Sequence, residues 1–311
     1  MSSFAKVTKL QTKVKNALDE ARILMLGAQV LLGFQYRGFF EKGYDELPPG
    51  DRFCELAGLA ALLVSVGALF LPASRHRLVE QGNDSEKFHK FTMLVMRFAL
   101  APFGIALTLD LGVAGERVLG PWGGAACAAI VGGAALALWY GHFARGDRKE
   151  HAVPEEKMEK TPLEHRIVQV LTEARVVLPG AQALLGFQLA MVLMEPFGQL
   201  PKEAKIVHLV GLACIALGTV MLMAPAAYHR IVERGEDTER FHDFASKMVL
   251  LAMALLAPGF AADLYVVLVR AGLPGFAWPA AIALLLLYYG VWFGAMLLLC
   301  KPPRLRRLLL R

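Results

Sequence analysis

Long apolar runs separated by short polar segments divide the chain into eight predicted membrane-spanning helices. A span needs about 20 mainly apolar residues. The runs that meet this need lie at approximately 22–40, 53–73, 91–112, 121–143, 175–194, 206–227, 244–268 and 276–299. A charged segment with two prolines separates the fourth run from the fifth. The pattern therefore predicts an all-α polytopic membrane protein.

The last four runs repeat the first four at a constant offset. The sequence EARILMLGAQVLLGFQ at 20–35 returns as EARVVLPGAQALLGFQ at 173–188, with 11 of 16 positions identical and an offset of 153. A fixed-period repeat indicates a tandem duplication. We predict a first four-helix repeat over 1–144, a charged cytoplasmic linker over 145–162, and a second repeat with a basic tail over 163–311.

Lysine and arginine are distributed unequally between the two sides of the predicted bilayer. Both termini, the linker and the loops on their side carry most of the 33 basic residues. The positive-inside rule places this side in the cytoplasm. Each repeat has an even number of spans, so both repeats are expected to have the same orientation, as a parallel pseudo-dimer within one chain.

Composition agrees with a protein whose main partner is the lipid bilayer. The 311 residues are 56% hydrophobic and 19% charged, with a mean hydropathy of +0.47. The net charge of +6 is explained by topology and does not require a nucleic-acid partner. The four cysteines show no paired spacing. We find no nucleophilic triad, phosphate-binding glycine loop or zinc motif, and therefore expect neither an enzyme nor a cofactor.

Two duplicated aspartates, Asp110 and Asp263, follow apolar runs near the ends of the third predicted helix of each repeat. A carboxylate near a helix C-terminus is disfavoured by the helix dipole. A cation, a proton or hydrogen-bond donors must therefore offset it, and a buried carboxylate could carry protons. The alternative is a hydrated aspartate paired with Arg117 or Arg270.

Further polar residues repeat within the first helix of each repeat. Arg22 and Gln29 are seven residues apart and share one helix face, and Arg175 and Gln182 repeat that face. This face could line an ion pathway between the repeats. Alternatively, the glutamines bond neighbouring helices and the arginines form interfacial ion pairs. Gln35 and Gln188 lie on a different face, where we expect them to join helices.

The loop HRLVEQGNDSEKFHKF at 76–91 returns as HRIVERGEDTERFHDF at 229–244. Much of it suits a structural connection, with Asp84 and Asp237 as N-caps of the next helices. A second interpretation is a pH-sensing cytoplasmic gate, because histidine titrates near neutral pH. The gate candidates are His76, Glu80, His89, His229, Glu233 and His242. A third is a metal site, because Glu-x-x-His also occurs in di-iron bundles. Its ligands would be Glu86, His89, Glu239 and His242.

The second repeat resembles an uncharacterised bacterial family of four-helix membrane proteins, some members of which are labelled sodium:proton antiporter. The matching residues are Leu171–Arg175, Leu178–Gln182, Ala224–Arg230 and Ala262–Asp263. The first repeat departs from this pattern at Leu26 and Arg75. The resemblance implies a bacterial inner-membrane protein in which two family units are fused.

We therefore expect an inner-membrane protein with both termini in the cytoplasm that moves a small inorganic ion, H⁺ or Na⁺, as a transporter or channel. Asp110 and Asp263 would carry the ion, together with Gln29, Gln182, Arg22 and Arg175. One alternative is a non-transporting sensor or assembly protein, in which polar residues only join helices. A second alternative is a membrane metal-binding protein that uses the duplicated Glu-x-x-His.

Overall fold

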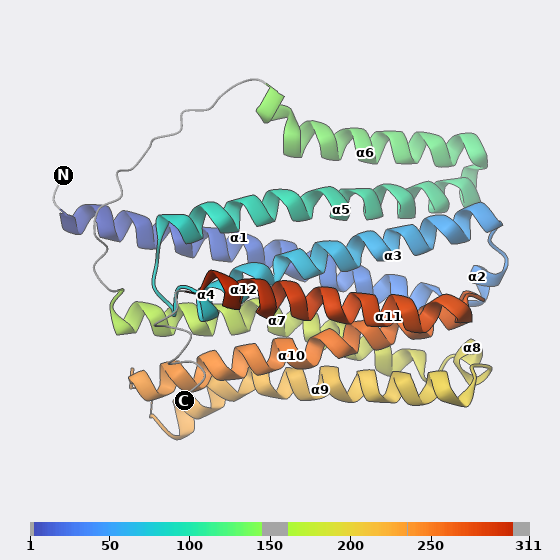
Figure 1. Cartoon of the computed structure of the whole chain (residues 1–311). Coiled ribbons are helices and arrows are strands. Elements are labelled where there is room, and N and C mark those ends of the chain that lie inside the picture. Colours follow the sequence, from blue (N-terminus) through green and yellow to red (C-terminus); the bar gives the residue numbers. More distant parts are fainter. Residues whose placement is uncertain (1–2, 145–160, 235, 301–311) are drawn as a thin grey trace.

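The computed structural model describes residues 3–144, 161–234 and 236–300, and this part of the chain is helical without strands. Most of the predicted linker at 145–162, and the predicted basic tail after residue 300, lie outside the described residues. Figure 1 shows long helices lying side by side along one common direction. The predicted all-α class is confirmed.

The first repeat contains four long helical segments. These are α1 (Ser3–Gly38), α3 (Pro49–Leu69) with its continuation α4 (Leu71–Leu78), α5 (Glu86–Leu119) and α6 (Pro121–Ala144). A single turn, α2 (Lys42–Asp45), joins α1 to α3. Local sequence sets these limits. Pro49 and Pro121 occupy first turns, where a proline loses no hydrogen bond. Gly120 has a φ of 77°, which allows the sharp turn between α5 and α6.

The second repeat has the same order of elements. It contains α7 (Leu163–Met191), the single turn α8 (Glu195–Gly198), α9 (Lys202–Ile231), α10 (Glu239–Arg270) and α11 (Pro274–Tyr289). The last helix continues through a π-helical turn, η1 (Gly290–Gly294), into α12 (Ala295–Leu299). We call the end of the bundle where α2 and α8 lie the distal end, and the end where α1 and α7 begin the proximal end (Figure 1).

Seven helical segments in the described part of the chain are long and apolar enough to cross a membrane. They correspond to the predicted spans except the first. The helix α1 is not among them, because Arg22, Gln29, Gln35 and Arg37 interrupt its apolar half. The length and composition of the seven segments are those of a membrane protein.

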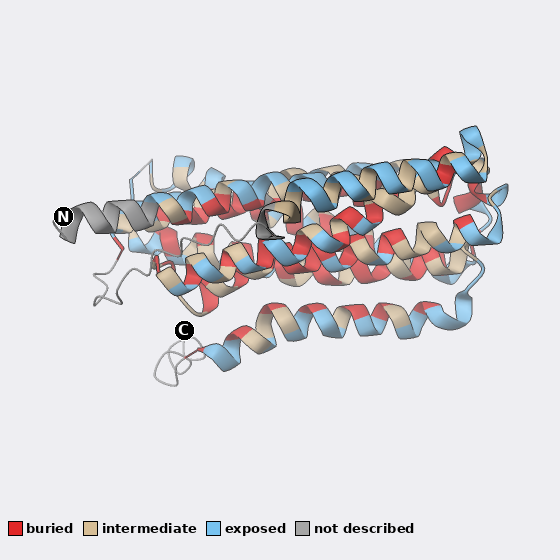
Figure 2. Ribbon diagram, turned by 90° about the horizontal axis from the view of Figure 1, so that it is seen from above, coloured by how far each residue is buried: buried red, intermediate tan, exposed pale blue. Residues whose placement is uncertain are grey.

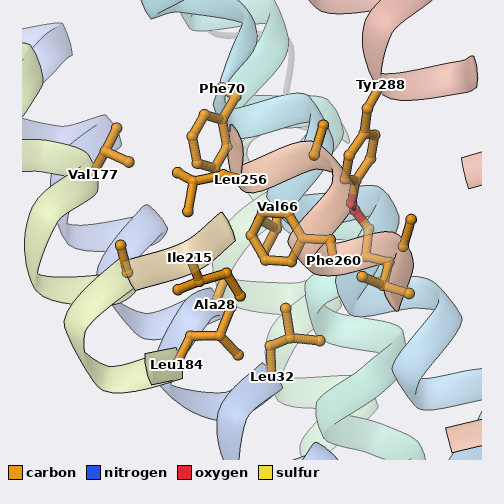
Figure 3. Close-up of a cluster of buried hydrophobic side chains, with 14 of the residues drawn as sticks. Ala28, Leu32, Val66, Phe70, Val177, Leu184, Ile215, Leu256, Phe260 and Tyr288 are labelled. Carbon is orange, nitrogen blue, oxygen red and sulfur yellow. Dashed lines mark hydrogen bonds between the residues drawn. The ribbon is translucent and has the colours of Figure 1, made fainter. Parts of the chain in front are cut away.

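The two repeats have matching contacts within themselves and share one core. In the first repeat, α1, α3 and α5 contact one another and α6 packs on α5. In the second, α7, α9 and α10 contact one another and α11 packs on α10. The main contact between repeats is α1 against α7. Figure 3 shows the shared core, in which side chains of both repeats meet. They include Ala28, Leu32, Val66 and Phe70 from the first, and Val177, Leu184, Ile215, Leu256, Phe260 and Tyr288 from the second.

The fourth helices of the two repeats differ in position. The helix α6 lies at the edge of the bundle, with Ile130 and Leu138 exposed (Figure 1). In contrast, η1 and α12 contact α4 of the first repeat, and Tyr288 of α11 donates a hydrogen bond to Leu63 of α3. Figure 2 shows this last helix, which ends near the C label, with its buried residues turned towards the bundle. Ala135 occupies the register position of Tyr288, so α6 lacks the hydroxyl that Tyr288 uses across the repeats.

Candidate functional site

The first duplicated aspartate, Asp110 on α5, is joined to the first helix of its own repeat. The Nε2 atom of Gln35 donates a hydrogen bond to Asp110 Oδ1 at 2.5 Å. Gly58 of α3 faces this pair. A Cβ atom at Gly58 would lie 2.7 Å from Gln35 Nε2 and 3.1 Å from Asp110 Oδ1. Because Gly58 has no side chain, the pair of Gln35 and Asp110 fits between α1, α3 and α5.

The second repeat forms the same pair at the same register positions. Gln188 of α7 donates through Nε2 to Asp263 Oδ2 of α10 at 2.5 Å, and both residues are almost completely buried. His208 of α9 lies next to this pair, with its Nε2 atom 3.2 Å from the backbone carbonyl oxygen of Gln188. We call the two arrangements the Asp–Gln pairs. Gln35 and Gln188 join helices, as the sequence predicts.

Each Asp–Gln pair leaves polar atoms without a partner. One carboxylate oxygen of each aspartate and the carbonyl oxygen of each glutamine are buried and accept no hydrogen bond from the described residues. An unpaired charge is costly in a hydrocarbon environment. An amide carries an acceptor oxygen as well as a donor nitrogen, so the same geometry also accommodates a protonated aspartate that donates to the oxygen of a rotated amide. The pairs are therefore suited to hold a proton or a cation.

The alternative pairing of these aspartates with arginine is wrong. Arg117 donates to the carbonyl oxygen of Gly43 at 3.0 Å and to Glu46 at 2.8 Å. Arg270 forms a bidentate pair with Asp45 at 2.9 and 2.8 Å. Both arginines lie about two helical turns beyond the aspartates, and both contact α2 or the residue after it at the distal end. They cannot neutralise Asp110 or Asp263 at the same time.

A buried charged cluster lies at the proximal end, between α4 of the first repeat and α7 and α10 of the second. At its centre, His76 Nδ1 donates to Glu173 Oε1, and Arg77 donates to Glu173 through Nε at 2.5 Å and Nη2 at 2.7 Å. Arg77 also donates to Ser246 Oγ at 3.1 Å. We call His76, Arg77, Glu173 and His242 the proximal cluster. The buried ion pair of Arg77 with Glu173 joins the first repeat to the second.

His242 lies between two guanidinium groups. Arg77 Nη1 is 3.3 Å from Nε2 of His242, and Arg166 Nη2 is 3.2 Å from its Nδ1. A neutral imidazole has one acceptor nitrogen, and a protonated one has none. The two arginines therefore favour the neutral form. Gly82, with a φ of 79°, fits directly above this ring, because an added Cβ would lie 2.7 Å from His242 Nε2.

The structure brings together two of the four predicted metal ligands, Glu239 and His242. Ligand atoms of Glu239, His242 and Asp243 lie within 4.8 Å of one another. However, Glu239 is already paired with Arg166 at 3.0 Å, and both nitrogens of His242 face cations. Among the described residues, Glu86 and His89 belong to no such group. The charge of the two arginines opposes a metal cation at this position.

The remaining predicted gate residues have other side-chain partners or none in the described part of the chain. Glu80 faces Arg75 at 3.5 Å, and His229 faces Asp237 at 3.6 Å. Glu233 and His89 are half-buried. The predicted N-caps are also wrong, because Ser85 and Thr238 accept the capping hydrogen bonds. Asp84 is instead buried and accepts from Gln169, and burial raises the pKa of its carboxyl group.

The polar residues predicted to line a shared pathway do not come together in the structure. Arg22, Arg175 and Gln182 are exposed on the outside of the bundle. Gln29 is completely buried against Gly180 of α7, and both polar atoms of its amide lack a partner among the described residues. The difference arises because α1 and α7 do not present equivalent faces to each other.

Glu173, Arg77 and Arg166 were not among the pathway or gate residues predicted from the sequence. Glu173 belongs to the duplicated EAR motif, but its equivalent Glu20 is exposed, so the repeat pattern alone could not show that only the second copy is buried. Predicting that equivalent residues differ in burial requires knowledge of how the two repeats pack together.

Comparison with known proteins supplies a family and no activity. No curated protein and no solved structure matches the chain. The profile of the Family of unknown function (DUF6328) matches twice, over residues 5–142 and 155–296. These ranges coincide with the two repeats, and together they cover most of the sequence. The chain is therefore a member of the DUF6328 family that contains two family units in tandem.

Proposed function

We propose that this protein transports a small cation, H⁺ or Na⁺, across the bacterial inner membrane, as a transporter or channel. The observation that supports the proposal most directly is the pair of duplicated aspartates. Each lies within an apolar helix, and each keeps a buried carboxylate oxygen without a partner among the described residues. Intramembrane carboxylates are costly and characteristically serve ion or proton pathways.

In the proposed topology, the chain crosses the membrane eight times as two parallel repeats. The first span is the apolar half of α1, which lies within the bundle beside α3, α5 and α7. The proximal end and both termini face the cytoplasm, as the distribution of basic residues indicates. The ion route runs beside α1 and α7. These helices carry Gln35 and Gln188, and they also form the main contact between the repeats.

Ion flux in proteoliposomes tests this proposal. The variant Asp110→Asn plus Asp263→Asn removes both carboxylates while keeping the size of the side chains. We expect H⁺ or Na⁺ flux to fall at least about tenfold, which corresponds to about 1.4 kcal/mol in an activation barrier. Glu41→Gln is the matched control, because Glu41 is an exposed distal carboxylate just after α1 that pairs with Arg37.

The result that contradicts transport is flux equal to that of empty liposomes for the wild type, or flux that is unchanged in the double variant. Circular dichroism and size-exclusion profiles of the variant show whether the bundle remains folded. A folded double variant with wild-type flux would assign the Asp–Gln pairs a purely structural role and would favour the sensor or assembly alternative.

A further inference from the structure

The two Asp–Gln pairs have the same core but different surroundings. On α3 of the first repeat, Asp51, Glu55 and Gly58 follow one another at helical spacing along one face. The equivalent positions on α9 are Ala204, His208 and Gly211. Two carboxylates of the first repeat are therefore replaced by a methyl group and an imidazole in the second.

The acidic face of α3 leads from the distal end to the first Asp–Gln pair. Asp51 lies in the first turn of α3, and Glu55 is one turn further along. Gly58, one turn beyond Glu55, is the residue against which Gln35 and Asp110 pack. Glu55 precedes Gly58 by three residues, so it lies on the face of α3 that meets Gln35 and Asp110. Asp51, Glu55 and Asp110 thus mark a line of carboxylates from the start of α3 towards the buried pair.

No cation of the protein neutralises this line among the described residues. Arg52, the adjacent basic residue on α3, donates to the carbonyl oxygens of Leu47 and Asp45 at 3.0 and 2.5 Å. Arg117 and Arg270 are held at α2 and at the residue after it. The positive end of the α3 dipole favours Asp51, but this effect falls off within the first turn and does not reach Asp110.

The buried end of the line also offers neutral oxygen. Gln35 is 5% exposed and turned towards Asp110, and its carbonyl oxygen has no donor among the described residues. Oδ2 of Asp110 is likewise buried and without a donor there. Hard cations are bound by carboxylate and carbonyl oxygens of this kind. Like charges in such a place cannot all remain ionised unless a cation or proton joins them.

We propose that the first repeat contains a Na⁺ site formed by Asp110, Glu55 and the carbonyl oxygen of Gln35, which the ion enters from the distal end past Asp51. The inference rests on the proposed transport of a small cation and names the repeat that binds it. The second repeat, with His208 at the position of Glu55 and Ala204 at that of Asp51, holds a single carboxylate and binds no Na⁺.

Binding of Na⁺ alone to the purified full-length protein tests the site without any flux measurement. Thermal unfolding is followed in detergent with NaCl against choline chloride at equal ionic strength, and ²²Na⁺ equilibrium binding gives the affinity and stoichiometry. We expect one site per chain. Asp110→Asn and Glu55→Gln should each weaken Na⁺ binding at least about tenfold, whereas Asp263→Asn should leave the affinity within about twofold of the wild type.

Two further variants keep the test decisive if Asp110→Asn misfolds. Glu55→His copies the residue that the second repeat carries at this position, and it should abolish Na⁺ binding in a folded protein. Asp51→Asn should reduce the association rate of Na⁺ several-fold, because Asp51 lies at the entrance.

The proposal is overturned if NaCl and choline chloride act alike, which would mean that the carboxylates share a proton instead. It is also overturned if Asp263→Asn abolishes binding as completely as Glu55→Gln. Failure of the site and failure of transport remain distinguishable. Flux that depends on both aspartates without Na⁺ binding removes the site and keeps proton transport, whereas Na⁺ binding without flux keeps the site and removes transport.

Discussion

The hydroxyl group of Tyr288 donates a hydrogen bond to the backbone carbonyl of Leu63 at 2.7 Å, although the two residues are 225 positions apart. One turn further along the same helix, Trp292 donates through Nε1 to the carbonyl of Gly67 at 2.8 Å. Ser74 in turn donates to the carbonyl oxygen of Trp292, which lies in the π-helical turn. The last helix of the second repeat is thus attached to the first repeat through backbone groups.

Removing the Tyr288 hydroxyl should loosen this attachment. Tyr288→Phe is expected to lower the free energy of unfolding by about 1 kcal/mol, the scale of interhelical hydrogen bonds in membrane proteins. Tyr289→Phe is the matched control, because the Tyr289 hydroxyl bonds to Ala254 of the second repeat at a more exposed site. Thermal unfolding in detergent measures both. Equal effects of the two variants would contradict a special role for the contact between repeats.

Glu173 and Glu20 occupy equivalent positions and should respond differently to the same substitution. Glu173→Gln leaves Arg77 buried without its carboxylate, and breaking a buried ion pair costs about 3–5 kcal/mol. Glu20→Gln changes an exposed residue and should be nearly neutral. Denaturation curves of the two variants provide the comparison. A stable Glu173→Gln protein would show that the proximal cluster does not hold the repeats together.

Gly180 and Gly27 form a second pair of equivalent positions. A Cβ atom at Gly180 would overlap the Gln29 amide, whereas one at Gly27 meets nothing within 4 Å. Gly180→Ala should therefore destabilise the protein by about 1–3 kcal/mol through overpacking, and Gly27→Ala should stabilise it slightly. Melting temperatures of both variants decide the matter. The double variant Gly180→Ala plus Gln29→Ala should recover much of the loss, because the overlapping amide is removed.

The distal pair of Asp45 with Arg270 should make stability depend on pH in the acidic range. The hydrogen bonds from Arg270 lower the pKa of the Asp45 carboxyl group. A group with a lowered pKa in the folded state stabilises the protein above its unfolded pKa, and this contribution is lost as the pH falls through the folded pKa. Because the pair is half exposed, we expect less than about 1 kcal/mol.

The measurement compares the wild type with Asp45→Asn between neutral and strongly acidic pH. The wild type should be the more stable protein near neutrality, and the two stabilities should converge at strongly acidic pH, as the pH falls through the lowered pKa of Asp45 and the carboxyl group is protonated. A constant difference across the whole range would show that the substitution acts through packing and not through the charge of Asp45.

Several elements could be predicted from the sequence because they depend on local patterns. Seven of the predicted spans appear as apolar helices, and the offset of 153 coincides with two matches to one family. The predicted first span is not among these helices, because two glutamines and two arginines lower the hydropathy of α1. The packing of α1 beside α3, α5 and α7 explains why Gln29 and Gln35 are buried. Asp110 and Asp263 were expected at the C-terminal ends of their helices, but α5 and α10 continue at least about two turns beyond them, to Leu119 and Arg270.

The candidate site could be predicted only in part, for a physical reason. Sequence spacing shows which residues share a helix face, but it does not show which helix that face meets. Gln35 and Asp110 are 75 residues apart, and nothing in either local sequence indicates their contact. His76 and His242 of the proximal cluster were predicted as gate residues, but the contacts of His76 and Arg77 with Glu173 were missed for the same reason, since Glu173 belongs to the other repeat.

By itself, the sequence determined the helical class, the duplication and the apolar lengths, because backbone hydrogen bonding and burial in lipid act on each segment separately. Only the tertiary structure decided how equivalent residues diverge. The repeats meet through α1 and α7, and α11 but not α6 packs across them. Glu173 is therefore buried while Glu20 is not, and Glu55 lies on the helix face that meets the first Asp–Gln pair, at a position where the second repeat has His208. Equivalent residues of the two repeats have different neighbours because packing contacts form between helices that are far apart in the sequence.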